Sequence, residues 1–281
     1  MDNEPESEQI ILGYLTHDII DARGILLLAE GTPLTPKIVQ QIQQHGLIFN
    51  IATEPLGRIV AEHAVFKIPD KLEKKFTRID GARIDAAAGY MKWVLNRAKE
   101  NIFLNNNLKI LAQGHRATYS HSINVSLIAV AIAQKLNFSQ AALHEIALGA
   151  LYHDIGKILL PKTVLDDMNG VAEGQTLIYQ QHTILGGDLL AAEKLPLGIS
   201  LIAQQHHEKI SGNGYPKGLQ GYEIHFNAAV VAVADVFDRL TSGVFQSPVF
   251  TADEALEQIR QAKGIDYHPQ VVEAFLELLP L

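Results

Sequence analysis

Residues 151–157 of the chain are LYHDIGK, and residues 206–216 are HHEKISGNGYP. The first stretch places an imidazole and a carboxylate, His153 and Asp154, at the end of an apolar run. The second places two more imidazoles ahead of a turn that contains glycines and a proline. Burying an aspartate in an apolar helical protein is expensive unless a cation or several donors compensate it. The two stretches therefore predict a helical fold around a two-metal hydrolytic site.

Length and composition limit the class of protein. With 281 residues, 47% of them hydrophobic, the chain can bury a substantial core and can form one large domain and a smaller one. A formal net charge of -8 argues against a nucleic-acid partner. The absence of cysteine excludes disulfides and thiol catalysis. Neither a signal peptide nor an apolar run of about 18 residues is found, so we expect a cytoplasmic protein without membrane association.

The character of the sequence changes near residue 70. Residues 10–52 are strand-like and rich in turns, so we predict a small β-rich N-terminal module with a linker over 1–70. From 80 to 281, apolar residues recur every three to four positions, which predicts an all-helical catalytic domain and a mainly α fold class. We expect helices near 82–105, 115–136, 139–152, 175–193, 197–208, 226–242, 252–262 and 268–279.

Single histidines and aspartates also interrupt the apolar helices. His121 begins the run HSINVSLIAVAIA, and Asp235 lies within AAVVAVADVFD. Taken alone, His121 and His182 are each interpreted as a hydrogen-bonded core histidine. An unpaired Asp235 would cost of the order of several kcal/mol, so this residue needs a partner. Because the helix faces that carry these residues must converge in a bundle core, we predict a single shared metal site.

Two further segments border the predicted site. Lys157 follows Asp154 by three residues, and it either forms a plain salt bridge or orients the carboxylate and helps to neutralise a phosphate. Gly214, Tyr215 and Pro216 are interpreted as a stiff loop beside the site, because a residue before proline is confined to extended geometry. An ordinary turn is the alternative for this segment.

These motifs resemble the HD-GYP domains, a subgroup of the HD phosphohydrolase superfamily. HDIGK at 153–157, HHE followed by GNGYP at 206–216, and VAVADVFDRLTS at 231–242 are similar to that family's three blocks, in its order. The resemblance covers approximately 110–280. It implies an all-helical domain that binds two or three metal ions, commonly iron or manganese. It also implies hydrolysis of the bacterial second messenger cyclic di-GMP to pGpG or GMP.

The resemblance also implies a role for each polar residue. One metal is served by His121, His153, Asp154 and Asp235, and a second, bridged by Asp154, is held by His182, His206 and His207. These imidazoles and carboxylates suit two divalent ions of Fe or Mn better than Mg. Lys157 would stabilise or protonate near the leaving group. Gly214, Tyr215 and Pro216 would form a lid or a guanine-contacting edge.

The chain departs from the family pattern at three places. Ala117 stands where members with a third metal carry Glu, which predicts a two-metal centre. Residues 243–249, GVFQSPV, replace an Arg-Pro-Tyr-Arg-like run that binds substrate phosphate, and residues 166–170, DDMNG, replace a Lys-Pro-Gly-like stretch. Charge-assisted phosphate contacts contribute roughly 1.5–3 kcal/mol each, so their loss weakens binding about a hundredfold or changes the preferred ligand.

Three functions therefore remain open. The first is a cyclic di-GMP phosphodiesterase, and the second is a catalytically weak or inactive cyclic-dinucleotide receptor or signalling scaffold stabilised by metal. The third is a hydrolase of another phosphodiester. The helices near 82–105, with Tyr90 and Trp93, also offer a surface for a second copy, so we expect a possible homodimer.

Overall fold

The computed structural model confirms the mainly α class. It describes residues 13–14, 19–20, 26–28, 33–34, 79, 81–160, 164–165, 173–193, 195–242 and 249–279. The helices are α2 (Gly81–Glu100), α3 (Ile102–Gly114), α4 (Arg116–Lys135), α5 (Gln140–Tyr152), α7 (Glu173–Ala192), α8 (Leu197–Gln205), α9 (Phe226–Ser242), α10 (Ala252–Gln261) and α11 (Pro269–Leu276). Two short 3-10 helices, η2 (Ile155–Leu159) and η3 (Gly221–Glu223), complete the helical elements of the described residues.

Four short strands lie within the predicted β-rich module. β1 (Gly13–Tyr14) pairs with β4 (Pro33–Leu34), and β2 (Ile19–Ile20) pairs with β3 (Leu26–Leu28), both antiparallel. Most of residues 1–70 lie outside the described residues. The module and the domain boundaries at 70 and 80 therefore stay predictions.

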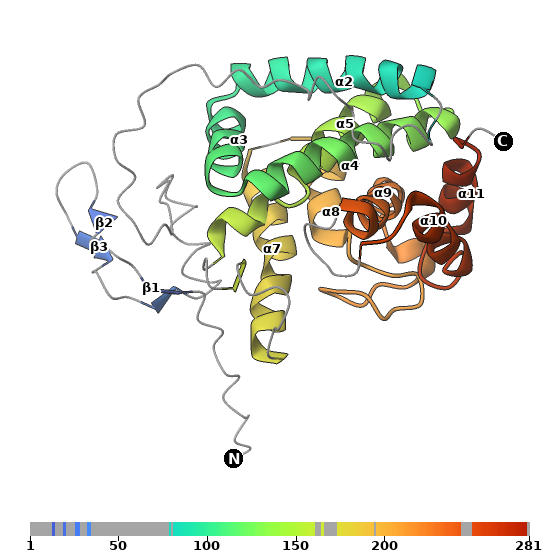
Figure 1. Cartoon of the computed structure of the whole chain (residues 1–281). Coiled ribbons are helices and arrows are strands. Elements are labelled where there is room, and N and C mark those ends of the chain that lie inside the picture. Colours follow the sequence, from blue (N-terminus) through green and yellow to red (C-terminus); the bar gives the residue numbers. More distant parts are fainter. Residues whose placement is uncertain are drawn as a thin grey trace.

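Helix α4 is the centre of the helical part. It packs against α2, α3, α5, α9 and α11, and in Figure 1 it runs beneath α2 and beside α5. Its side chains are buried without interruption from His121 to Ala133, as expected for a helix that is apolar on all sides. The buried hydroxyl of Ser126 donates a hydrogen bond to the carbonyl of Ala147 on α5 at 2.9 Å, so the polar group inside this interface is satisfied.

The sequence prediction of one helix over 82–105 is wrong. Helix α2 ends at Glu100 and α3 begins at Ile102, because Asn101 between them has extended backbone angles. The Asn101 side chain accepts a hydrogen bond from the Leu104 backbone N–H at 2.9 Å and so caps α3. Asparagine is among the preferred N-cap residues. The helices predicted near 139–152 and 252–262 are confirmed, and the side chains of Ser139 and Thr251 cap them.

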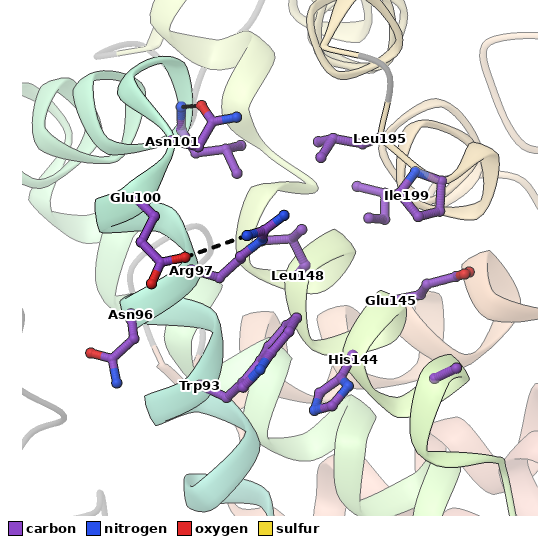
Figure 2. Close-up of a pocket in the computed structure, with 13 residues that line it drawn as sticks. Trp93, Asn96, Arg97, Glu100, Asn101, His144, Glu145, Leu148, Leu195 and Ile199 are labelled. Atoms are coloured by element: carbon purple, nitrogen blue, oxygen red, sulfur yellow. Dashed lines mark hydrogen bonds and ion pairs between the residues drawn. The ribbon is translucent and has the colours of Figure 1, made fainter.

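The face of α2 that was expected to meet a second copy lies partly against α5. The Trp93 ring stacks on His144 with centroids 3.9 Å apart, and Tyr90 lies 5.3 Å from the same ring. Beside this stack, α2, α5 and α8 enclose a cavity of about 560 Å³ with Leu148 and Ile199 in its lining (Figure 2). Trp93 keeps 41% of its surface exposed. The homodimer stays a prediction.

None of the described helices is long and apolar enough to cross a membrane. Several of these helices pack against one another near the middle of the helical part. Helix α5 packs against α8, and η2, which follows α5 in the chain, packs against α7. Helix α8 packs against both α7 and α9. The predicted metal ligands lie on these elements and on α4.

Candidate metal centre

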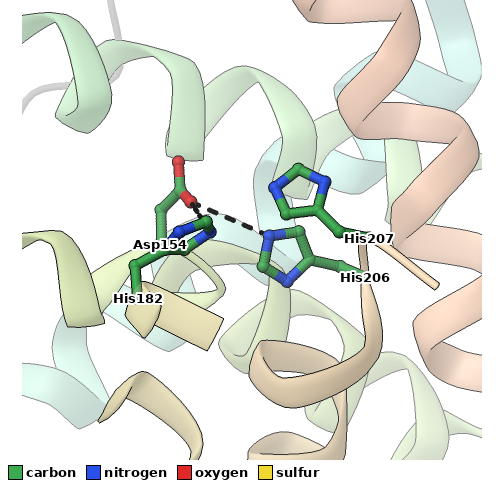
Figure 3. Close-up of side chains that lie close together, drawn as sticks. All are labelled: Asp154, His182, His206 and His207. Atoms are coloured by element: carbon green, nitrogen blue, oxygen red, sulfur yellow. Dashed lines mark ion pairs between the residues drawn. The ribbon is translucent and has the colours of Figure 1, made fainter. Parts of the chain in front are cut away.

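The structure brings all seven predicted metal ligands together. They are His121 on α4, His153 and Asp154 just after α5, His182 on α7, His206 and His207 just after α8, and Asp235 on α9. Asp154, His182, His206 and His207 form one group, and His121, His153 and Asp235 form another. Within each group, one ligand atom per residue lies within 4.8 Å of the others. Figure 3 shows the first group, in which the His182 and His206 rings point toward the Asp154 carboxylate and the His207 ring lies beside His206.

Asp154 belongs to the first group but faces both groups, since it directs its Oδ1 atom toward the first group and its Oδ2 atom toward the second. Its Oδ2 atom is 3.8 Å from His121 Nε2 and 3.4 Å from His153 Nε2. Its Oδ1 atom is 3.3 Å from His182 Nε2 and 3.8 Å from His206 Nε2, as the dashed lines of Figure 3 mark. A carboxylate in this arrangement can contact two cations at once.

Asp235 also contacts both groups. Its Oδ1 atom lies 2.9 Å from His121 Nε2 and 3.9 Å from His153 Nε2. Its Oδ2 atom lies 3.8 Å from His207 Nδ1. Because α8 ends at Gln205, the chain turns where it carries two adjacent histidines, and both rings reach the site.

The hydrogen bonds of three imidazoles fit metal binding. His153 Nδ1 lies 2.7 Å from the backbone carbonyl of Ala150. His182 Nδ1 lies 2.6 Å from that of Tyr179, and His206 Nδ1 lies 2.9 Å from that of Ala203. A carbonyl can only accept, so each Nδ1 carries the proton and each Nε2 keeps its lone pair. These three Nε2 atoms and Asp154 Oδ1 are buried without a hydrogen-bond partner among the described residues. Histidines that ligate metals have this arrangement.

His121 is oriented by a carboxylate instead of a carbonyl. Its Nδ1 atom lies 2.7 Å from Oδ2 of Asp238, which is fully buried on α9. Burial alone would lower the pKa of His121, but Asp235 and Asp238 outweigh it and raise that pKa to about 9. The sequence analysis gave Asp238 no role. Its position three residues after Asp235, on the same helix face, was the available signal.

Three other histidines of the site, His182, His206 and His207, are held neutral. Burial lowers the pKa of His182 to about 4 and lowers the pKa values of His206 and His207 well below the ordinary value. Neutral imidazole is the form that binds a metal ion. Burial opposes ionisation of Asp154, but the charge of Lys157 and the neighbouring imidazoles hold its pKa well below the ordinary value. His182, His206 and His207 therefore present neutral nitrogen donors beside the charged carboxylate of Asp154.

Lys157 forms the predicted ion pair. Its ammonium donates a hydrogen bond to Asp154 Oδ2, and its side chain is only 5% exposed. The segment that carries it is η2, not a continuation of α5. The Lys157 Nζ atom also lies 5.3 Å from the centre of the Tyr179 ring. The ion pair is therefore part of the buried site, and the predicted contact of Lys157 with phosphate stays a proposal.

Gly156 was missed by the sequence analysis. A Cβ atom at this position would overlap the carbonyl oxygen of His182 and would lie 2.6 Å from the backbone nitrogen of Gly186. The backbones of η2 and α7 therefore touch at this point, as glycine permits. This contact sets the distance between Asp154 and His182. The available sequence signal was the glycine between Asp154 and Lys157. The sequence does not show that α7 is the helix that this glycine contacts.

The GNGYP segment borders the site as predicted. The buried carboxylate of Glu208 accepts hydrogen bonds from the backbone N–H groups of Lys217 at 2.7 Å and Leu219 at 3.0 Å. These bonds fold the loop back onto the end of α8. A Cβ atom at Gly214 would overlap the backbone of Glu208, which explains the glycine. The Tyr215 ring then lies 4.7 Å from the His207 ring.

The contacts with a guanine predicted for Gly214, Tyr215 and Pro216 stay a prediction. The Tyr215–Pro216 peptide bond is cis. Burial raises the pKa of Tyr215 well above its ordinary value, so its hydroxyl is a neutral donor at physiological pH. The residue is half-buried at the edge of the site.

A protein-family model and three known proteins match this chain. A model of the HD domain family matches residues 104–271. A cyclic di-GMP phosphodiesterase of Thermotoga maritima is 37% identical over 164 residues, which cover 57% of this chain and 44% of the relative. The cyclic di-GMP phosphodiesterase response regulator RpfG of Xanthomonas campestris pv. campestris is 36% identical over 155 residues, 54% of this chain and 41% of the relative. The 3'3'-cGAMP-specific phosphodiesterase 2 of Vibrio cholerae is 30% identical over 164 residues, 58% of this chain and 31% of the relative.

The chain thus spans less than half the length of these relatives. A solved structure supports the fold. Bd1817, a HDG"Y"P protein from Bdellovibrio bacteriovorus, superposes with a TM-score of 0.50 at 22% sequence identity. The superposition covers 72% of this chain and 64% of that protein.

Proposed function

The chain belongs to the HD domain family, and we propose that it is a metal-dependent phosphodiesterase that hydrolyses cyclic di-GMP to pGpG or GMP. The observation that carries the proposal is the position of Asp154, with one carboxylate oxygen toward each of two groups of buried imidazoles. Two relatives at 36% and 37% identity are cyclic di-GMP phosphodiesterases, which supports this substrate.

We assign two divalent ions, Fe or Mn, to the centre. His121, His153 and Asp235 would hold one ion, and His182, His206 and His207 would hold the second, with Asp154 shared between them. Such ions, when bound, act as Lewis acids that acidify water and offset charge on phosphoryl oxygens. The orphaned Nε2 atoms of His153, His182 and His206 support this assignment, because buried polar atoms without partners are rare.

The chain's own residues prepare the centre in three ways. Asp238 and the backbone carbonyls fix the ring orientations. Lys157 keeps Asp154 ionised and fixes its Oδ2 atom. Because the charge of Asp154 outweighs burial and raises the pKa of Lys157, the ammonium is a poor proton donor, and orientation of the carboxylate is the role we assign. Tyr215 offers a ring on which a guanine base can stack.

A second substrate is favoured by a specific observation. The relative from Vibrio cholerae at 30% identity is specific for 3'3'-cGAMP, which is also a cyclic dinucleotide. Cyclic di-GMP is the first choice because the relatives that act on it are more similar to this chain. Competition between the two dinucleotides at fixed metal content decides the preference.

The test combines elemental analysis with turnover on one sample. Protein purified without chelator and loaded with Mn or Fe is expected to contain about two ions per chain and to cleave cyclic di-GMP. A variant with His153→Ala and Asp154→Ala is expected to lose both the metal and the turnover. Nucleotide binding without any product, from fully metallated samples of several metals, would instead identify a receptor or signalling scaffold.

A further inference from the structure

In the described part of the chain, two ion pairs join a lysine or arginine to a proposed ligand carboxylate. Lys157 contacts Asp154, and Arg239 Nη1 lies 3.6 Å from Asp235 Oδ2. The Lys157 side chain is 5% exposed, whereas the Arg239 side chain is 32% exposed. The Arg239 side chain is therefore more accessible to a molecule arriving from solvent than the Lys157 side chain.

Arg239 lies on α9, one turn after Asp235, at the edge that the Tyr215 loop borders. Burial alone would lower the pKa of Arg239, but Asp235 outweighs it, and Tyr179 and Tyr215 act in the same direction. These tyrosines also flank the imidazoles, since the Tyr215 ring lies 4.7 Å from the His207 ring. The guanidinium is therefore a permanent positive charge beside the proposed metal centre.

The contact with Asp235 does not occupy the guanidinium. At 3.6 Å the Nη1 to Oδ2 distance is an ion pair beyond ordinary hydrogen-bond length. A guanidinium has five N–H donors in a planar fork that matches the oxygens of a phosphate. Donors of Arg239 can therefore bind an anion while the ion pair with Asp235 holds the side chain in place.

We propose that Arg239 binds a phosphate group of the substrate at the edge of the metal centre. It would take the place of the Arg-Pro-Tyr-Arg-like run that is missing from residues 243–249. This inference rests on the phosphodiesterase function proposed above. A chain with a formal net charge of -8 repels an anionic dinucleotide in general, so a local cation is needed where the phosphate arrives.

The alternative is that Arg239 only positions Asp235. The two roles differ in what the substitution Arg239→Gln removes. A phosphate contact strengthens anion binding and leaves the metal content unchanged. A positioning contact changes the orientation of Asp235, so its loss lowers the metal content and the turnover together.

The experiment compares Arg239→Gln and Arg239→Lys with the wild-type holoprotein. Arg260→Gln is the matched control, because Arg260 is 60% exposed on α10 and pairs with Glu257. Elemental analysis gives the metal content, steady-state kinetics give KM and kcat for cyclic di-GMP, and calorimetry gives the Kd for inorganic phosphate.

We expect Arg239→Gln to raise KM and the Kd for phosphate about 10- to 100-fold at unchanged metal content. Arg239→Lys is expected to give an intermediate loss, since it keeps the charge but not the planar fork. Arg260→Gln should match the wild type. Parallel loss of metal and activity in Arg239→Gln, or unchanged KM and Kd, overturns the inference.

The phosphate measurement separates this inference from the function on which it rests. If the metallated wild type does not cleave cyclic di-GMP but its phosphate affinity falls in Arg239→Gln, the phosphate contact stands and the proposed activity fails. If the metallated wild type does not bind phosphate at all, the contact itself is wrong.

Discussion

The two ends of helices α5 and α8 differ in how deeply the charged side chains beside them are buried. The C-terminal ends carry His153, Asp154, His206 and His207, whose side chains are at most 9% exposed. The N-terminal ends line the cavity beside Trp93 (Figure 2). There the charged groups lie on the rim, and Arg97 and Glu100 of the neighbouring α2 are 62% and 68% exposed.

This difference predicts how each end responds to substitution. At the buried end, water cannot replace a lost partner, so removing one charge leaves another uncompensated. At the exposed end, water solvates each group that loses its partner, and an ion pair contributes little. At the buried end of these two helices, we therefore expect each substitution of a polar group to have a large effect. At the exposed end, we expect few such substitutions to have one.

The largest effect is expected for Asp154→Asn. The amide keeps the shape but removes the charge that both imidazole groups face, and it leaves the buried Lys157 without its ion-pair partner. Turnover and metal content should both fall about 100-fold or more. Asp85→Asn, on the exposed face of α2, is the control and should change neither. Equal metal content in the two variants, measured by elemental analysis, would refute the shared-carboxylate arrangement.

A smaller loss is expected for Asp238→Asn. This change weakens the bond that orients the His121 ring but leaves all seven proposed ligands in place. Metal affinity should fall about 10- to 100-fold, as for other groups that orient a ligand. Titration of the metal-free protein with Mn measures the change. An affinity equal to that of the wild type would mean that Asp238 serves only to fill the core.

Gly156→Ala tests the contact between η2 and α7. The added methyl group would overlap the His182 carbonyl oxygen, so the two elements must separate. We expect a loss of about 1–3 kcal/mol in the free energy of unfolding of the metal-free protein, measured by denaturant titration. Gly89→Ala is the matched control, because its Cβ would meet nothing within 4 Å on helix α2. That control should gain about 0.5–1 kcal/mol from helix propensity.

The smallest effect is expected at the exposed end. Arg97→Gln removes the pair with Glu100, whose atoms are 3.3 Å apart. The free energy of unfolding should change by no more than about 0.5 kcal/mol, and metal content and turnover should stay at the wild-type level. A clear loss of turnover would show that the cavity beside Trp93 influences the metal centre through α5 or α8.

The sequence was sufficient to predict the helical class and the convergence of the seven proposed ligands. Asp235 stands out inside an apolar helix because a buried aspartate needs a partner, whereas His121 and His182 were assigned as ligands only through the resemblance to the HD-GYP domains. The helix predicted near 197–208 ends earlier, at Gln205, so both adjacent histidines lie where the chain turns. The break at Asn101 was visible as an N-cap residue and was overlooked.

The missed residues depend on packing between segments that are far apart in the chain. Gly156 has its role only because α7 lies against η2, and Glu208 because the loop that follows it folds back. Asp238 and Arg239 follow Asp235 on one helix, but their roles depend on His121 and on the direction of solvent access. A periodic pattern shows which face of a helix is buried, and it does not show which helix covers that face.

The most direct test of the central claim is a crystal structure of the Mn-loaded protein with anomalous scattering data. We predict two anomalous peaks, one beside Asp154 Oδ1 among His182, His206 and His207, and one beside Oδ2 with His121, His153 and Asp235. A single peak, or two peaks of which only one contacts Asp154, would contradict the claim that this carboxylate joins two metal sites.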